Sequence, residues 1–376
     1  MTCFGLGGAE MEREGLERIV RTEDVAVMGI TEVVRHMPRI YAEYRRLVAS
    51  IKARRPGVAI LIDFPDVNFR LAKELKKLNI PVVYFVSPQL WAWKRSRLRW
   101  VQQRVSRMMV IFPFEEPFYR ARGVDAEFVG HPLATLPMPV QSRALFAARY
   151  CLDAAKPWVA LLPGSRHKEV SLNLPEMLGA AASLNREGGF QFLLPVASTV
   201  VRSFVRSVVL DVSAEVPITL VDDARTAMHH ARASMVASGT ATVQAAVIGN
   251  PFVVVYRVSP TTFRLAKRLV RYPSEIPAAP DDAGNLPIAM VNLVAGKRVV
   301  PELLQGQFTG ENMAAALRPL LEDGPARETM IADLAQVRDA LLPIAGTNPI
   351  CRVCDAVQSL LAERAAAHVL TSPSSV

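Results

Sequence analysis

Two strand–turn–helix joints in the second half of this chain constrain its fold more than any other feature. Apolar runs at 158–162 and 233–237 each lead into a short turn of glycine and hydroxylated residues, and a helical pattern follows. In an open α/β sheet, such joints direct backbone N–H groups and a helix N-terminus at the edge where phosphate groups bind. One joint alone is a weak signal because many α/β proteins contain it. Two joints predict a cleft for a nucleotide or a nucleotide sugar.

The composition is that of a globular chain with two cores. Hydrophobic residues make up 51% of the 376 residues and charged residues 21%, and a chain of this length usually divides into two domains. No apolar run reaches the roughly 18 residues that a membrane-spanning helix needs. Residues 1–14 lack the basic and apolar regions of a signal peptide. We therefore expect a cytoplasmic protein of two domains.

Apolar runs and helical patterns alternate along the whole chain. Strands that alternate with helices in this way are parallel and are joined by right-handed crossovers. The pattern predicts an α/β protein with two doubly wound, Rossmann-like domains and a cleft between them at the carboxyl ends of both sheets. We expect domains at 1–135 and 136–345, followed by a C-terminal helix and polar tail at 346–376. The strands are predicted at 57–63, 81–86, 107–112, 158–162, 190–195, 217–221, 233–237 and 252–256.

Candidate catalytic and binding residues follow two strands of the first domain. Asp63 comes directly after a predicted strand, where a partly desolvated carboxylate could accept a proton from a hydroxyl group. Alternatively, Asp63 or Asp66 caps the next helix, for which Asn68 is also suited. Trp91 and Trp93 follow the next strand, where they could stack on a sugar, cover an acyl chain or anchor the core.

Basic residues surround an apolar stripe in the first half of the chain. Residues 31–55 are predicted to be helical apart from Pro38, with an apolar stripe from Val33 to Ile51. The net charge of the chain is +9, and a second basic cluster lies at 94–104. The segment is either an ordinary surface helix or an interfacial helix on anionic lipid. We expect no nucleic-acid partner, because no RNA- or DNA-binding signature is present.

Eight short motifs, taken in order and spacing, resemble those of the lipid-A-disaccharide synthase family. The resemblance covers residues 4–360, nearly the whole chain. The motifs are VAVMGI (25–30), IDFPDVN (62–68), VSP with WAW (86–93), FPFE (112–115), VGHP (129–132), LPGSR (162–166), ASGTA (237–241) and LAKRLV (265–270).

The resemblance implies an inverting, metal-independent glycosyltransferase of the GT-B fold that acts in lipid A biosynthesis, a part of lipopolysaccharide synthesis. Such an enzyme joins UDP-2,3-diacylglucosamine to 2,3-diacylglucosamine 1-phosphate, which yields lipid A disaccharide 1-phosphate and UDP. It is peripheral on the inner face of the inner membrane. Asp63 matches the proposed base of the family. The predicted substrate-binding residues are Gly164, Ser165, Arg166, Ser238, Gly239, Thr240, Gln244, Asn68 and Trp93.

The residues themselves are compatible with this chemistry. Inversion needs one base for the acceptor hydroxyl, which Asp63 can supply, and stabilisation of the charge that develops on the leaving UDP. Arg166 and two helix N-termini can supply the second without a metal or another cofactor. Because a substrate with several acyl chains must come from a bilayer, we favour membrane docking by the 33–51 stripe and expect an anionic membrane as a partner. The chain is expected to be a monomer or a homodimer.

Two departures from the family pattern qualify these expectations. The family opens with a strand, a Gly-Glu-x-Ser-Gly-Asp loop and a helix, and this chain begins after them. Loss of that central strand leaves buried backbone groups unpaired at about 1–3 kcal/mol each. Either the start codon is assigned too far downstream, or the chain is a fragment, or the protein is damaged, and we expect the first. Gln244 stands where the family usually has Glu, and we expect weaker UDP binding, since the amide keeps an acceptor oxygen.

Two other functions remain open from the sequence. One is a truncated, inactive homologue that binds a nucleotide sugar without transferring it. The other is a UDP-sugar epimerase of similar fold, which would need further acid and base residues around the sugar.

Overall fold

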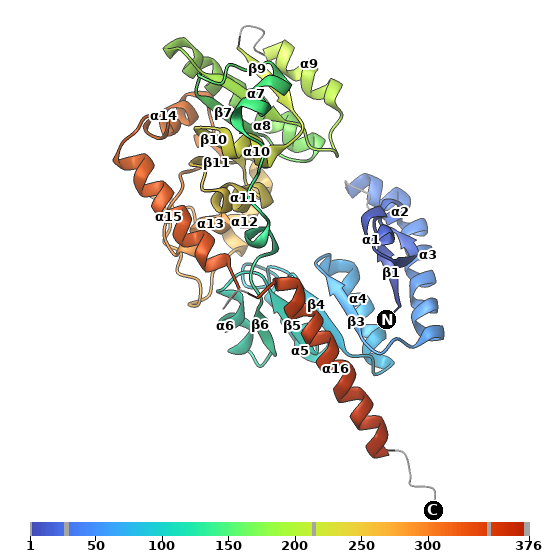
Figure 1. Ribbon diagram of the computed structural model, residues 1–376. Helices are drawn as coiled ribbons and strands as arrows, with labels where there is room; N and C mark the ends of the chain where they lie inside the picture. Colours follow the sequence, from blue (N-terminus) through green and yellow to red (C-terminus); the bar gives the residue numbers. More distant parts are fainter. Residues whose placement is uncertain (1, 26–29, 213–215, 344–346, 372–376) are drawn as a thin grey trace, which may run out of the picture.

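The computed structural model describes residues 2–25, 30–212, 216–343 and 347–371. Within these residues the strands form parallel sheets that follow one another along the chain (Figure 1). A four-stranded sheet has the order β3-β4-β5-β6, a six-stranded sheet the order β12-β11-β10-β7-β8-β9, and β1 pairs with β2 in a separate sheet. The strands are β1 (Cys3–Gly7), β2 (Leu16–Arg21), β3 (Ala59–Ile62), β4 (Val82–Phe85), β5 (Arg107–Val110), β6 (Ala126–Phe128), β7 (Trp158–Leu162), β8 (Gln191–Pro195), β9 (Ile218–Val221), β10 (Ala233–Ala237), β11 (Phe252–Tyr256) and β12 (Glu302–Leu304).

Helices connect the strands and cover the two larger sheets (Figure 1). Every described strand pair is parallel, so each connection is a crossover, and the predicted α/β fold is confirmed. The helices are α1 (Ala9–Arg13), α2 (Thr22–Val25), α3 (Ile30–Arg54), α4 (Pro65–Lys77), η1 (Arg95–Arg97), α5 (Leu98–Arg104), α6 (Glu115–Arg120), η2 (Pro132–Thr135), α7 (Arg143–Tyr150), α8 (His167–Glu187), α9 (Arg202–Val212), α10 (Ala224–His230), α11 (Thr240–Ile248), α12 (Pro260–Leu269), α13 (Met290–Ala295), η3 (Gln305–Gln307), α14 (Gly310–Leu321), α15 (Pro325–Leu341) and α16 (Pro349–Thr371).

The central strands carry apolar residues along their whole length. All residues of β4, β7 and β10 are buried, as expected for parallel strands covered on both faces. Burial on both faces leaves only the strand ends free to meet a ligand. The carboxyl ends of these strands therefore set the positions of the functional side chains.

The C-terminal helix α16 returns to the first sheet after the chain has completed the second (Figure 1). The Arg364 guanidinium donates to the carbonyl oxygen of Gly57 at 2.9 Å, and Arg352 pairs with Glu127. These contacts fasten the end of the chain to residues beside β3 and β6. In the described residues, no helix combines the length and apolar character that a membrane span requires.

Two helices in the first half differ from the predicted boundaries. Helix α3 continues through Pro38, which was expected to interrupt it. Helix α4 begins at Pro65, before Asp66 and Asn68, which were considered as its caps, because proline is favourable in a first helical turn. The N-cap position is Phe64, without a side-chain cap hydrogen bond, and Asp66 instead pairs with Arg97 at 2.8 Å. The alternative that Asp63 or Asp66 caps this helix is therefore wrong.

Candidate functional site

Asp63 lies exposed at the carboxyl end of β3. Its φ is 44° and that of Phe64 is 42°, so two consecutive residues other than glycine adopt the left-handed conformation. Such backbone costs of order 1–3 kcal/mol per residue and persists where surrounding contacts hold it. The turn directs the chain sharply into α4 and leaves the Asp63 carboxylate at the sheet edge.

Two buried polar side chains hold this strained turn in place. The Asn68 amide donates to the carbonyl oxygens of Ile62, at 3.0 Å, and Asp63, at 2.7 Å. The Tyr84 hydroxyl donates to the same Asp63 carbonyl oxygen at 2.6 Å. Burial raises the pKa of Tyr84, and the Asp63 charge adds to this effect, so the hydroxyl stays a donor. Asn68 thus positions Asp63, whereas its contact with substrate remains a prediction.

Glu115 is a buried carboxyl group at the same sheet edge, and it was not predicted from the sequence as a site residue. It lies at the start of α6, is 1% exposed, and accepts hydrogen bonds from Ser87 at 2.6 Å and from Trp91 at 3.1 Å. Burial raises the pKa of Glu115 to about 7. Its position after a predicted strand, among aromatic residues, is the sequence feature that could have indicated a buried carboxyl group here.

The two tryptophans after β4 have different environments. Trp91 is 1% exposed and packs edge-on against Phe114, with ring centroids 5.1 Å apart, so it anchors the core. Trp93 is 47% exposed, and the Lys94 ammonium lies 4.1 Å from its ring centroid. Only Trp93 is therefore available for a ligand.

The loop after β7 presents a ready anion site that a side chain of the protein occupies. The Ser165 N–H donates to one Glu169 carboxylate oxygen at 3.0 Å, and Arg166 donates to the other at 2.7 Å. Gly164 has a φ of 123°, and a Cβ at that position would lie 2.5 Å from Glu169. Glycine is thus required both by the backbone and by the close approach of the carboxylate.

The loop after β10 presents a second helix N-terminus at the carboxyl edge. Gly239 is the N-cap of α11 and makes no side-chain cap hydrogen bond, so the first N–H groups of this helix point outward from Thr240. The Ser238 N–H donates to Val255 at 2.9 Å, which fixes the loop to β11. Gln244, one turn further along α11, is partly buried. Both loops lie at the carboxyl edge of the six-stranded sheet, because β7 and β10 are adjacent.

Contacts between the two domains join the loop after β4 and the end of α6 to the segment that follows α12. Arg122 pairs with Glu275 at 2.7 Å, and the rings of Trp91 and Tyr272 lie 5.6 Å apart. The Arg271 N–H donates to the carbonyl oxygen of Ala92 at 3.3 Å. The carboxyl edge of the first sheet is therefore attached directly to the second domain.

His131 fills a structural place between the two sheets. It is 6% exposed, and its Nδ1 accepts from the Leu133 N–H at 3.1 Å as the N-cap of η2. Burial lowers the pKa of His131 to about 4, so the ring is neutral near pH 7. This geometry gives His131 a structural role at the junction.

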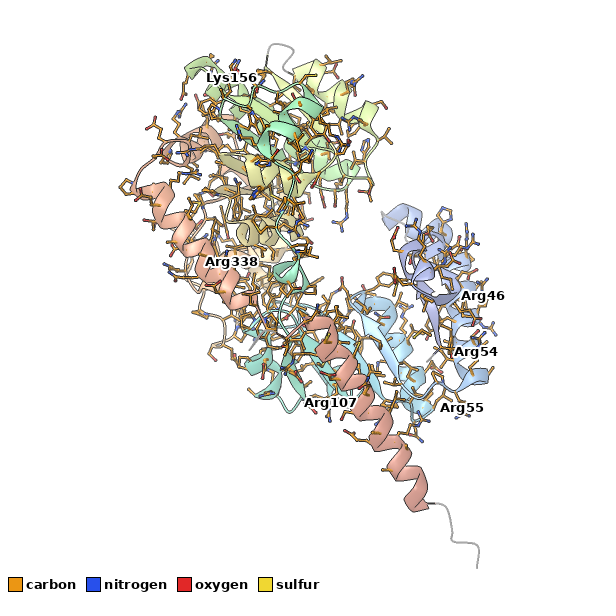
Figure 2. All side chains as sticks on the ribbon, viewed as in Figure 1. Arg46, Arg54, Arg55, Arg107, Lys156 and Arg338 are labelled. Atoms are coloured by element: carbon orange, nitrogen blue, oxygen red, sulfur yellow. The ribbon has the colours of Figure 1, made fainter. Side chains whose placement is uncertain are left out.

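Helix α3 turns most of its described apolar stripe toward the protein. Leu47 and Ile51 are buried, whereas Met37 is 47% and Tyr41 58% exposed. The prediction that the whole stripe docks on lipid is therefore wrong for Leu47 and Ile51, which face the protein. The side chains of Val33 and Val34 are outside the part of the chain that the structure describes. The basic residues Arg46, Arg54 and Arg55 lie along the outer side of the molecule (Figure 2).

Among the described residues, no group of three or more histidine, cysteine, aspartate or glutamate side chains is placed to hold a metal ion. The carboxyl edge of the first sheet instead carries the exposed Asp63 carboxylate, and that of the second carries an arginine and two helix N-termini. This set can accept one proton and stabilise one anion.

Several solved structures have the same fold as this chain. The calicheamicin glycosyltransferase CalG4 matches with a TM-score of 0.59 and 14% identity, covering 97% of this chain and 91% of its own. The S. aureus MnaA complex with UDP also has a TM-score of 0.59, with 12% identity and 96% of both chains covered. At these identities the similarity shows the fold alone, which is that of the GT-B glycosyltransferases and related epimerases.

Sequence relatives are far closer. A lipid-A-disaccharide synthase of Acidobacterium capsulatum is 54% identical over 96% of this chain and 90% of its own length. Those of Koribacter versatilis and Myxococcus xanthus are 50% and 40% identical over 90% and 96% of this chain, and 85% and 90% of their own lengths. The family model described as lipid-A-disaccharide synthetase matches residues 1–345. The chain therefore belongs to the lipid-A-disaccharide synthase family, whose members are glycosyltransferases of lipid A biosynthesis.

Proposed function

We propose that this chain transfers a diacylglucosaminyl group from UDP-2,3-diacylglucosamine to the 6-hydroxyl of 2,3-diacylglucosamine 1-phosphate, with inversion at the anomeric carbon. Asp63 removes the proton of the acceptor hydroxyl. Arg166 and the N-terminus of α11 stabilise the negative charge on the departing UDP. The observation that carries the proposal is the exposed Asp63 carboxylate on a strained turn, held by two buried side chains.

The remaining predicted residues complete this proposal. Gly164, Ser165, Gly239 and Thr240 supply backbone N–H groups to the diphosphate. Ser238, whose N–H is bonded to Val255, supplies its hydroxyl group, and Gln244 contacts the ribose. Trp93 lies against the sugar or an acyl chain of a substrate. The family name supports these roles through the substrate it implies.

The location and assembly of the protein are part of the proposal. We place the chain in the cytoplasm, peripheral on the inner face of the inner membrane, as a monomer or homodimer with domains at 1–135 and 136–345. Support comes from Met37 and Tyr41, which stay exposed on a basic helix suited to anionic lipid.

Substitution of Asp63 by Asn tests the catalytic role. Without a general base, kcat should fall by roughly 10²- to 10⁴-fold, while the affinity for UDP stays within about twofold because the nucleotide contacts lie on the other domain. The measurement is disaccharide formation from both substrates in detergent micelles, with UDP binding followed by calorimetry.

Asp66→Asn is the matched control, since Asp66 lies three positions away and pairs with Arg97. Its kcat should remain within about threefold of the unsubstituted chain, because surface ion pairs contribute little. Retention of full activity by Asp63→Asn, or an equal loss in both variants, would contradict the proposal.

A further inference from the structure

Helix α12 (Pro260–Leu269) has an apolar stripe that the protein leaves uncovered. None of its residues is buried, and Leu265 and Leu269 are 57% and 58% exposed. These leucines are four positions apart, so they occupy the same face of the helix. A helix that is amphipathic but packs so little of its apolar face has a surface available for a partner.

The exposed Trp93 lies close to the end of this helix. Leu269 is two positions before Arg271, whose N–H donates to Ala92, the residue before Trp93. The Arg95 guanidinium also donates to the Arg271 carbonyl oxygen, and the rings of Trp91 and Tyr272 are in contact. The end of α12 and the loop that carries Trp93 and Lys94 therefore form one junction between the two domains.

Both segments are basic and free of acidic residues. From Val258 to Ser274 there is no aspartate or glutamate, whereas Arg264, Lys267, Arg268 and Arg271 are basic. The same holds from Lys76 to Phe114, which contains Lys94 and Arg95. Lys267 donates to Ala283 and Asn285, but the Arg264 and Arg268 side chains are exposed. Exposed leucine and tryptophan beside uncompensated cations are the chemistry of a surface that docks on anionic lipid.

We propose that α12 and the Trp93–Lys94 loop form a docking surface for an anionic bilayer, beside the junction of the two domains. Leu265, Leu269 and Trp93 enter the interfacial layer, and Arg264, Arg268 and Lys94 contact lipid phosphates. The inference rests on the proposed function in one respect, because a bilayer partner follows from an acylated substrate. It adds a second membrane contact, which extends from the Trp93–Lys94 loop of the first domain onto α12 of the second.

The test is co-sedimentation of the full chain with vesicles, either phosphatidylcholine alone or phosphatidylcholine with phosphatidylglycerol. Leu265→Ser/Leu269→Ser should weaken binding to the anionic vesicles by about tenfold or more, since two apolar anchors are lost. Arg264→Gln/Arg268→Gln should weaken it by roughly threefold or more at low salt and less at high salt. Leu210→Ser and Arg206→Gln are the controls, because both side chains are exposed on α9 and should leave binding unchanged.

Fluorescence gives a second readout without substrate. The emission of the chain should shift to shorter wavelength on anionic vesicles, and Trp93→Phe should remove most of the shift. Of the other three tryptophans, Trp91 and Trp158 are already buried, and Trp100 is half-buried against Phe69. Equal binding by the leucine pair and by Leu210→Ser would overturn the proposal. A second outcome would also overturn it. If Leu265→Ser/Leu269→Ser changes the chain from dimer to monomer and leaves vesicle binding intact, the apolar face of α12 contacts a second copy of the chain. Transferase activity in detergent micelles separates the two proposals, because the leucine variant should keep it and Asp63→Asn should lose it.

Discussion

At the scale of single residues, the loop after β7, which we propose to bind the diphosphate, already holds a carboxylate of the protein. Glu169 accepts the Ser165 N–H and pairs with Arg166, the same donors that a diphosphate would require. An incoming anion must displace this carboxylate or accept a like charge beside it. Glu169 thus stabilises the loop after β7 but lowers the affinity of this loop for a diphosphate.

Glu169→Gln should therefore strengthen UDP binding. A neutral amide is a weaker acceptor than a carboxylate and removes the like charge, so the Kd for UDP should fall by about threefold to tenfold. Calorimetric titration with UDP and with uridine measures the effect, and uridine affinity should not change because it lacks the diphosphate. Glu311→Gln, in the first turn of α14, is the control. Weaker UDP binding in Glu169→Gln would show that the carboxylate supports the loop instead.

Some residues of the candidate site could be predicted from sequence and others could not. Asp63 and the two glycine turns stand directly after apolar runs, and this position alone indicates the carboxyl edge of a sheet. The left-handed turn at Asp63 could not be predicted, because it depends on Tyr84, a residue of the neighbouring strand. Glu115 was missed for the same reason, since its burial requires Ser87 and Trp91 from another loop.

At the scale of elements, length and burial decided which parts were predictable. The predicted strands at 158–162 and 233–237 coincide with β7 and β10, because buried parallel strands are continuous apolar runs. The strands β6 and β12 were not predicted, since each has three residues and lies at the edge of its sheet. Pairing with a neighbour, and not composition, defines such short strands.

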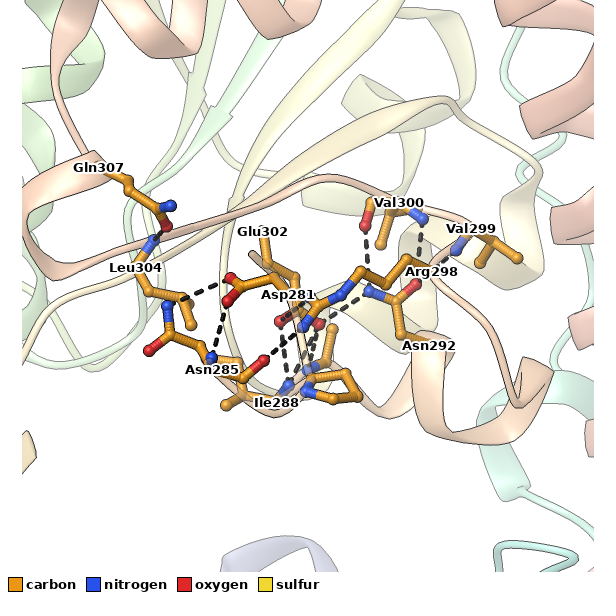
Figure 3. A network of polar contacts seen from close by, with 12 residues as sticks. Asp281, Asn285, Ile288, Asn292, Arg298, Val299, Val300, Glu302, Leu304 and Gln307 are labelled. Carbon is orange, nitrogen blue, oxygen red and sulfur yellow. Dashed lines mark hydrogen bonds and ion pairs between the residues drawn. The ribbon is translucent and has the colours of Figure 1, made fainter. Parts of the chain in front are cut away.

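The segment between α12 and β12 is ordered by one buried carboxylate (Figure 3). Glu302 accepts hydrogen bonds from the N–H groups of Ile288 and Ala289, from the Asn292 amide at 2.8 Å and from Arg298 at 3.2 Å. Asn292 in turn accepts from the Val299 and Val300 N–H groups. Through these bonds β12 holds α13 and the irregular chain before it.

Glu302→Ala should destabilise the second domain by about 3 kcal/mol, because it leaves several buried donors without an acceptor and Arg298 without its partner. Chemical unfolding followed by circular dichroism measures the loss. Asp339→Ala is the control, since that carboxylate is exposed and pairs with the exposed Arg338, and its removal should cost less than about 1 kcal/mol. Equal losses in the two variants would contradict the role assigned to Glu302.

At the scale of the whole molecule, the two sheets could be predicted but their attachment could not. Alternation of strands and helices indicates two domains, yet the return of α16 to the first sheet depends on contacts such as Arg364 with Gly57, 307 positions apart. The same is true of Arg122 and Glu275, which join the domains 153 positions apart. Sequence periodicity reports only local structure, so contacts over such separations lie beyond it.

Glu115 lies near this attachment and makes the stability of the molecule depend on pH. Its folded pKa is about 7, above the ordinary value of 4.5, because burial disfavours the charged form. The folded state therefore binds the proton more tightly than the unfolded state between these values. The stabilisation is complete below pH 4.5 and is lost as the pH rises to 7, by on the order of 3 kcal/mol.

Glu115→Gln removes this dependence, since an amide does not titrate. The melting temperature of the variant, relative to the unsubstituted chain, should increase steadily from pH 5 to pH 7 and level off above it. His131 has its pKa lowered to about 4 and destabilises both proteins equally in acid, so it cancels in the comparison. Glu116→Gln is the control, because Glu116 is the next residue of α6 and is partly exposed beside Arg120. Parallel melting curves for Glu115→Gln and the unsubstituted chain would show that Glu115 keeps an ordinary pKa, and that its hydrogen bonds with Ser87 and Trp91 outweigh its burial.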